Sequence, residues 1–451
     1  MNRREFLLRS GLTAGAFSLG GALMPRVARA AEVKDRYFVF CYFEGGWDAL
    51  ISLDPRNPAE FNDGNMLETG IQPGYDRLPG QFSRQNINAG PFTLGPCCGE
   101  LPQIADKFSV IRGINMATLT HEVGRRYFIT GKEPAGLNAQ GSSIATLAAS
   151  QIAGGETPDR PVPHLAHRVE SYNIDQPAFA TAMPVAAVGH MQYILQDTLG
   201  IPTGIRPNVR GALGAYWSKR RDCAPGRGAS ATAIADAYRS NRARARDVVT
   251  TALYSQFQFD APELAGVREH YGINAGLLET PRGRAALASQ ALRSGLSRVV
   301  SVVLADGLDT HDGNWANEQS TRLSEGFTAL ARLITDLDQT EAPGGGGSLL
   351  SKTTIVAFSE FNRTPRLNER NGRDHHLGNC AVVAGGGIQP GKVIGASSDL
   401  AMGPLHIDLA SGQADESGVS LSPTHVMATA LQSGGLDASD LRIDGIPGLL
   451  A

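Results

Sequence analysis

Five short apolar runs without polar alternation predict the strands of this chain. They are rich in β-branched and aromatic residues, and polar or glycine-rich segments follow them. A strand that is covered on both faces carries such a continuous run, whereas a strand with one face in water alternates apolar and polar positions. The runs lie at residues 37–43, 108–112, 299–304, 353–358 and 380–384. We therefore expect a sheet that is buried on both sides.

Helical periodicity fills the intervals between these runs. It covers residues 230–258, 282–294 and 320–338. In the last of these segments one apolar stripe is formed by Leu323, Phe327, Leu330, Leu333, Ile334 and Leu337. The alternation of strands and helices predicts an α/β sandwich with a mainly parallel central sheet.

Two long stretches, 55–95 and 154–228, are dominated by Pro, Gly, Asn and polar residues. They predict long surface loops or insertions at one edge of the sheet. No internal repeat interrupts the pattern, and α/β enzymes often enclose a single core of this size. We therefore expect one domain from residue 31 to residue 451.

Residues 1–30 have the three-part layout of an export signal. Arg3 and Arg4 resemble a twin-arginine signal, and a small-x-small cleavage site ends at Ala30. The apolar stretch between them is Gly-rich and weaker than a spanning helix requires. We expect export by the twin-arginine translocase, cleavage after Ala30, and a periplasmic or extracellular mature protein that is not an integral membrane protein. The alternative is an uncleaved N-terminal anchor.

The charge balance argues against a nucleic-acid partner. The formal net charge is −3, and without the first 30 residues 36 basic residues face 43 acidic ones. A domain that binds nucleic acid usually carries a basic patch and a net positive charge.

The cysteines indicate neither a zinc knuckle nor a dense disulfide framework. Their number is five, which is odd, and none has C-x-x-C spacing. Cys41 and Cys380 lie in strand-like runs and are expected in the core. Cys97, Cys98 and Cys223 lie in turn-rich sequence, where one pair could oxidise outside the cytoplasm.

Polar groups follow four of the strand-like runs. In an open parallel sheet the carboxyl ends of the strands are where ligands bind. In chain order these groups are Asp48; Thr118, Thr120, His121 and Arg125; Asp309 and His311; and Glu360, Arg363, Asp374, His375 and His376. A divalent metal needs several Asp, Glu and His ligands from different segments, because one short peptide rarely encloses an ion. The joint occurrence of these groups therefore predicts a polar functional centre.

The remaining histidines give a weaker signal. His164, His167, His190 and His270 lie in loop-rich or helical sequence, where a solvated or hydrogen-bonded structural histidine is more common than a ligand. His425 follows Ser422-Pro423, which open a helix, and we expect it in the first turn. The chain has neither a G-x-S-x-G elbow nor a phosphate-binding loop motif.

Several segments resemble the exported bacterial proteins grouped as domain of unknown function 1501. They are the twin-arginine start, GGWD at 45–48, the segment 121–131, DTH at 309–311, SEFNR at 359–363, and GRDHH at 372–376 followed by VVAGGGIQPGKVIG. The resemblance covers most of the mature chain.

That family is in turn similar to the alkaline phosphatase and sulfatase superfamily. The resemblance implies a three-layer α/β/α sandwich with one or two divalent metal ions, Zn, Mn, Ca or Mg, at the strand ends. The implied metal ligands are Asp48, Asp309, His311, Glu360, Asp374, His375 and His376. His121 stands at the position of the cysteine that sulfatases convert to formylglycine, and Thr120 or Thr118 is the alternative nucleophile.

The leading hypothesis is a metal-dependent hydrolase of a phosphate or sulfate ester, in which Arg125 and Arg363 orient an anionic oxygen. Its substrate would be a small anionic ester or a carbohydrate. The alternative is a non-catalytic exported binding or assembly protein that keeps the sandwich, because a fold does not determine a function. A third interpretation is a purely structural metal site.

Overall fold

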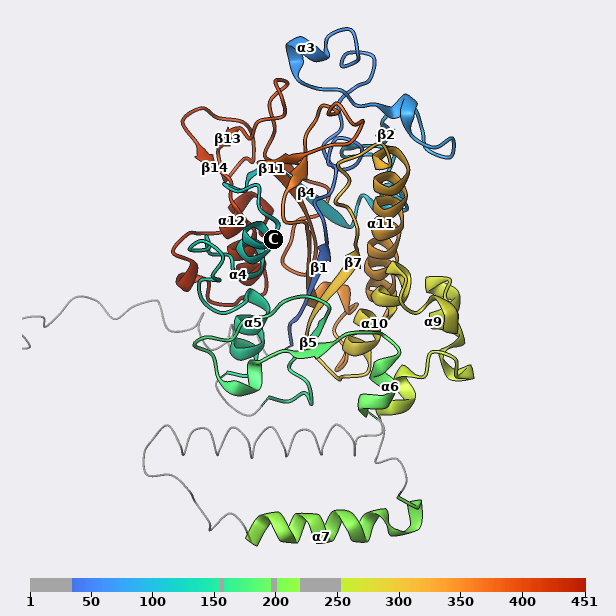
Figure 1. The fold of residues 1–451 in the computed structure, drawn as a ribbon. Coiled ribbons are helices and arrows are strands. Elements are labelled where there is room, and N and C mark those ends of the chain that lie inside the picture. The colour runs from blue at the N-terminus through green and yellow to red at the C-terminus, as the bar shows by residue number, and fades with distance from the viewer. Residues whose placement is uncertain (1–34, 155–157, 196–200, 220–252) are drawn as a thin grey trace, which may run out of the picture.

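The computed structural model describes residues 35–154, 158–195, 201–219 and 253–451 (Figure 1). The predicted signal at 1–30, Cys223 and most of the predicted helix at 230–258 lie outside these ranges. Among the residues described, no helix has the length and apolar character that crossing a membrane requires.

An eight-stranded sheet forms the centre of the molecule. Its strand order is β12-β4-β11-β8-β1-β7-β5-β6. The strands are β1 (Tyr37–Phe43), β4 (Phe108–Asn115), β5 (His164–His167), β6 (Met183–Val185), β7 (Val299–Ala305), β8 (Thr353–Phe358), β11 (Gly378–Gly385) and β12 (Val393–Ile394). All five predicted strands are present, and every residue of β1, β7 and β8 is buried. The continuous apolar runs thus reflect cover on both faces.

The sheet is mainly parallel, as predicted, with one reversed strand. β1 pairs in parallel with β7 and β8, whereas β11 runs antiparallel to both of its neighbours, β4 and β8. An antiparallel neighbour needs no helical crossover. The chain accordingly passes from β8 to β11 through residues 359–377, which contain only the short strands β9 (Asn362–Arg363) and β10 (His375–His376). These residues therefore remain at the carboxyl edge of the sheet.

Helices cover both faces of the sheet and form the predicted three layers (Figure 1). Two lie on one face, α10 (Pro281–Arg293) and α11 (Trp315–Gln339), and three on the other, α4 (His121–Thr130), α5 (Ile144–Ile152) and α12 (Pro423–Ser433). The other helices are α3 (Met66–Thr69), α6 (His190–Leu195), α7 (Arg206–Lys219) and α9 (Ala265–Tyr271). Two further strand pairs are β2 (Ile87–Asn88) with β3 (Thr93–Leu94), and β13 (His406–Ile407) with β14 (Val419–Ser420).

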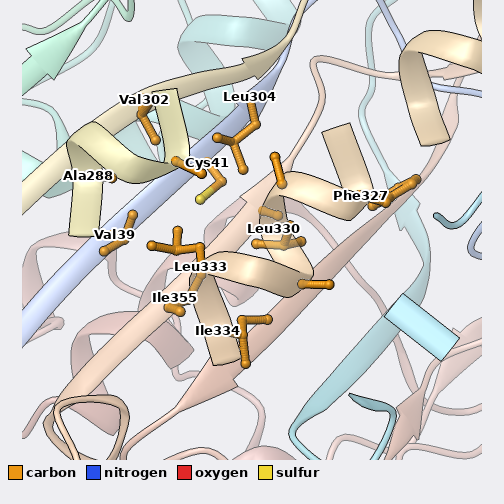
Figure 2. Packing of buried hydrophobic residues seen from close by; sticks show 14 of the residues in the cluster. Val39, Cys41, Ala288, Val302, Leu304, Phe327, Leu330, Leu333, Ile334 and Ile355 are labelled. Carbon is orange, nitrogen blue, oxygen red and sulfur yellow. The ribbon is translucent and has the colours of Figure 1, made fainter. Parts of the chain in front are cut away.

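The apolar stripe predicted on α11 faces the sheet. Figure 2 shows Leu330 and Leu333 of this helix in one cluster with Val39 and Cys41 of β1. A second cluster lies beneath α4, α5 and α12 on the opposite face. Because each face of the sheet is packed, its polar chemistry is confined to the ends of the strands.

The segment 154–228 contributes two strands of the sheet, where the sequence predicts loops. β5 is only four residues long, and His164 and His167 enclose its apolar centre. Both histidines are buried, and His164 Nε2 lies 3.0 Å from Ser301 Oγ of β7. Burial lowers the pKa of His164 to about 3, so this side chain is a neutral part of the core. Polar residues at both ends of a very short strand conceal the apolar run that would reveal it.

Two smaller predictions concern a helix start and the thiols. Ser422 and His425 form a reciprocal capping pair at the start of α12, which confirms His425 as a first-turn residue. Cys41 and Cys380 are buried in the core, as expected, and Cys97 and Cys98 are also buried as free thiols.

Gly326 provides a test of the contact between α11 and the sheet. A Cβ atom at this position would lie 2.6 Å from Phe43 Cε1 and 2.9 Å from Ala305 Cβ. Gly326→Ala should therefore destabilise the protein by about 1–3 kcal/mol through overpacking, although alanine favours a helix. Gly266→Ala in α9 is the matched control, because no atom lies within 4 Å of that site. The midpoint of urea unfolding should fall in the first variant and stay or rise in the second; equal midpoints would contradict this packing.

Candidate metal centre

Three side chains from separate segments converge at the carboxyl edge of the sheet. His121 is the first residue of α4, which follows β4. Asp309 lies in the loop after β7, and His375 lies on β10. Asp309 Oδ1 is 3.4 Å from His121 Nε2 and 3.6 Å from His375 Nε2. The three ligand atoms lie within 4.8 Å of one another, so a single ion could contact all of them.

His311 belongs to the same cluster. Its Nε2 is 2.9 Å from Asp309 Oδ1 and 3.1 Å from His375 Nε2. The D-x-H spacing brings Asp309 and His311 together because both residues lie in the turn after β7. Three imidazole nitrogens thus surround one carboxylate oxygen.

The hydrogen bonds of the three rings determine their tautomers. Nδ1 of His121 lies 2.8 Å from Glu360 Oε1, and Nδ1 of His311 lies 2.7 Å from Asp374 Oδ1. Nδ1 of His375 lies 2.6 Å from the carbonyl oxygen of Leu119. Ionised carboxylates and carbonyls only accept hydrogen bonds, so each Nδ1 is a donor. In the neutral imidazole each Nε2 is then unprotonated and carries a lone pair.

Arg363 Nη1 lies 3.3 Å from His311 Nε2, and a cation or a shared proton between the Nε2 lone pairs would satisfy the rest of the cluster. The Nε2 atoms of His311 and His375, 3.1 Å apart, would otherwise place two acceptors in contact. Nε2 of His121 is buried and has no hydrogen-bond partner in the described part of the chain. A ligating histidine whose other nitrogen donates to a carboxylate or a carbonyl is the usual arrangement at protein metal sites. The residues therefore fit a divalent metal.

The electrostatics of the cluster keep its carboxylates ionised. Burial raises the pKa of Asp309, but the Arg363 guanidinium and the nearby histidines outweigh it and lower this pKa to about 2. Burial likewise acts against Glu360, yet the hydrogen bonds from His121 and the backbone bring its pKa below the usual range. Burial lowers the pKa of His375, whereas Glu360 outweighs burial at His121 and raises its pKa.

Arg363 is predicted to bind substrate, but its guanidinium is fully engaged within the protein. Its Nη2 lies 2.7 Å from Asp309 Oδ1 and also contacts the Gly45 carbonyl. The other N–H groups reach the Gly46 and Arg373 carbonyls and His311 Nε2. These contacts use all of the guanidinium donors. Arg363 therefore orients Asp309 and stabilises the turn after β1.

Glycines allow the close approaches in this centre. Gly45 and Gly46 have φ values of 111° and 81°, which side chains rarely adopt. The backbone N–H of Gly45 donates to Glu360 Oε1 at 2.8 Å. Gly124 of α4 packs against the Glu360 backbone, where a Cβ atom would lie 2.3 Å from the carbonyl oxygen. α4 can thus bring His121 to Glu360 only because residue 124 has no side chain.

Asp48 is predicted as a metal ligand, but the structure places it in a buried ion pair. Its Oδ2 lies 2.9 Å from Arg373 Nε and accepts a 2.8 Å hydrogen bond from Trp315 Nε1. Its Oδ1 accepts from the backbone of Leu50 at 3.1 Å. Both charged side chains are 0% exposed. Asp48 is thus separate from the oxygen and nitrogen atoms that converge on Asp309.

The other predicted residues divide into those that support the centre and those that face away. Glu360 and Asp374, predicted as ligands, orient His121 and His311. Nε2 of His376 instead contacts the Ala401 carbonyl at 3.0 Å. Arg125 pairs with Glu170 at 2.6 Å, and Thr120 is the exposed N-cap residue of α4 without a side-chain capping bond.

One contributor is not apparent from the sequence, and another has a different place in the centre than the predicted one. The Leu119 carbonyl sets the tautomer of His375, and a backbone acceptor has no sequence signal. His121 is predicted as a nucleophile position, whereas the structure brings it into the ligand cluster. Gly124, three residues after His121 on the same helix, is the signal that could have indicated a close approach to another segment.

The fold and the site define an α/β protein with a histidine-rich candidate metal centre at the carboxyl edge of a mainly parallel sheet. The chain belongs to the family described as Protein of unknown function (DUF1501), whose model matches residues 35–441. A search of curated proteins finds no match to the sequence.

Solved structures with a distant likeness include two named hydrolases. The PsFucS1 sulfatase from Pseudoalteromonas sp. has 12% identity and a TM-score of 0.36, covering 95% of this chain and 76% of that one. The phosphonate monoester hydrolase SpPMH from Silicibacter pomeroyi has 12% identity and a TM-score of 0.34, covering 92% and 77%. Ps i-CgsB has 9% identity and a TM-score of 0.39, covering 91% and 75%. At such identities and TM-scores, the chemistry must be derived from the side chains of this chain.

The buried pair of Asp48 and Arg373 predicts a large and specific loss of stability. Asp48→Asn keeps the size of the side chain but leaves the Arg373 charge buried without its counter-ion. Thermal or urea unfolding should show a loss of about 3–5 kcal/mol. Glu318→Gln is the matched control, because Glu318 and Arg322 form an exposed pair 3.3 Å apart and one turn of helix apart. Its effect should be about 0.5 kcal/mol or less, and comparable losses in the two variants would contradict the structural role of Asp48.

Proposed function

We propose that this protein is a metal-dependent hydrolase of phosphate or sulfate esters, with one divalent ion bound by His121, His311, His375 and Asp309. The observation that supports it is the convergence of three Nε2 lone pairs on Asp309 Oδ1, with each Nδ1 proton committed to an acceptor. These donors comprise imidazole and carboxylate groups, and they come from three separate segments of the chain.

The ligand set favours zinc among the ions considered. Three imidazoles and one carboxylate suit Zn²⁺, and less readily Mn²⁺, whereas Ca²⁺ and Mg²⁺ prefer oxygen ligands. When bound, a divalent ion supplies Lewis-acid polarisation of an ester oxygen.

The side chains around the ligands supply orientation and access. Glu360 and Asp374 orient two of the imidazole rings, and Arg363 orients Asp309. Asp309 itself has a side chain that is 49% exposed, so a molecule from solvent can approach the ligand atoms. A rigid, partly open cluster is a suitable arrangement for binding a small anionic group.

The proposal includes export. Arg3 and Arg4 and the small-x-small site ending at Ala30 support recognition by the twin-arginine translocase and a periplasmic or extracellular mature protein. Translocation of a folded chain would let the metal bind before export, since the ligands come together only in the folded sheet.

Metal content and turnover test the proposal with two adjacent histidines. Mature protein purified without chelator should contain about one equivalent of metal by plasma mass spectrometry. His375→Ala should lose the metal and the hydrolysis of aryl phosphates or sulfates, whereas His376→Ala should keep both because His376 faces Ala401. A folded, metal-free wild type would contradict the metal site. Bound metal without turnover of any ester would favour the non-catalytic binding protein or a structural metal site.

Glu360→Gln tests the role of the carboxylate behind His121. Glutamine can still accept from Nδ1 but lacks the charge that makes the imidazole a better ligand, so metal affinity should fall about 10- to 100-fold. Chelator competition measures this change. Glu122→Gln is the control, because it removes the same charge from an exposed residue in the first turn of α4. Unchanged affinity in Glu360→Gln would show that His121 does not need this partner.

A further inference from the structure

A cleft of about 860 Å³ lies beside the candidate metal centre. One wall is the loop 364–374, which joins β9 to β10, and Gln72 and Arg77 contribute to the other. Asp374 lines the cleft and also contacts Nδ1 of His311 at 2.7 Å. The cleft and the candidate centre therefore adjoin at Asp374.

Most of the charged side chains that line the cleft are positive. Arg77, Arg366 and Arg370 line it, together with Glu369 and Asp374. Asp374 accepts a hydrogen bond from His311 and keeps its charge, so three guanidinium groups face two carboxylates in this lining.

The three arginines are held only loosely by other side chains. Arg366 is exposed, and its guanidinium has no ion pair or hydrogen bond with the residues that the structure describes. Arg370 lies 3.2 Å from Asp312, and Arg77 lies 3.4 Å from Asp63. In each pair the carboxylate is 63% exposed. Exposed ion pairs of this kind contribute little to stability, so a bound anion could replace the carboxylates as partners of the arginines.

The loop that carries two of these arginines is fixed to the candidate centre. Asn368 Nδ2 donates to the His311 carbonyl at 3.0 Å and to Asp374 Oδ1 at 3.1 Å. Its Oδ1 accepts from the backbone of Arg370 and Gly372, both at 3.0 Å. At its far end the loop is tied down by the buried Arg373, whose Nη1 donates to the Thr364 carbonyl at 2.7 Å. The cleft is thus preorganised relative to His311.

The two arginines predicted to bind substrate, Arg125 and Arg363, do not line the cleft. Arg363 has all its donors engaged, and Arg125 is paired with Glu170. Arg366 and Arg370, in contrast, line the cleft, and each has guanidinium N–H groups that no described residue engages. Guanidinium forks match the oxygens of phosphate and sulfate.

We propose that this cleft binds a second phosphate or sulfate group, so that the substrate is an ester with at least one further anionic group on the part that is not transferred. This inference rests on the proposed function for the transferred group. Arg366 is the principal contact, and Arg370 and Arg77 add to it.

Matched ligands with one and two anionic groups test the inference. Titration calorimetry of the mature, zinc-supplemented protein would compare glucose 6-phosphate with glucose 1,6-bisphosphate, and a monosulfated with a disulfated disaccharide. We expect about tenfold tighter binding of the doubly charged member of at least one pair. Arg366→Ala should remove this preference. Arg442→Ala, at an exposed arginine outside the cleft, should preserve it.

The outcomes separate this inference from the proposed function. The phosphate and sulfate arms identify the group that the cleft prefers. Equal affinity for both members of each pair, or a preference that survives Arg366→Ala, would overturn the cleft assignment even in an active enzyme. A preference lost equally in Arg442→Ala would overturn it as well, because it would reflect overall charge. Arg366-dependent binding without metal or turnover would support the anion cleft and refute the hydrolase.

Discussion

The buried ion pair between Asp48 and Arg373 is the interaction on which the site depends. Asp48 follows β1 in the middle of the sheet, and Arg373 precedes two residues of the candidate centre, Asp374 and His375. The pair also receives Trp315 from the first turn of α11. Removing both charges from water is costly, and hydrogen bonds from Arg373 Nη1 and Nη2 to backbone carbonyls and from Trp315 to Asp48 offset part of that cost. It joins the sheet, a helix and the site loop at one point.

The positions of the other side chains in the centre depend on this ion pair. With Arg373 immobilised, the backbone that follows it can present Asp374 toward His311 and His375 toward Asp309. The parallel strands bring the loops after β4 and β7 to the same edge, where His121 and Asp309 enter. A rigid support behind each ligand matters because a ring that rotates loses its lone-pair direction.

The sequence predicted the sheet well because its strands are buried on both faces. Four of the five apolar runs end where the structure has functional or supporting side chains. The sequence did not show which of these side chains face the candidate metal position and which support the others. Asp48 and Asp309 are both carboxylates placed after a strand, yet one is paired with Arg373 and the other faces three histidines. Which partner a carboxylate meets depends on contacts across hundreds of residues, and β5 was missed because its four residues carry too little pattern.

The reversed strand β11 has a consequence for the continuity of the site along the chain. Since it pairs beside β8 without a helical crossover, residues 359–377 form one uninterrupted excursion at the rim of the sheet. This excursion carries Glu360, Arg363, Asp374 and His375, together with the loop that shapes the cleft. A change in the exposed part of that loop would alter the lining of the cleft while the sheet and the candidate ligands stay in place. One continuous segment thus both supports the candidate ligands and shapes the cleft, so a single stretch of backbone couples the two.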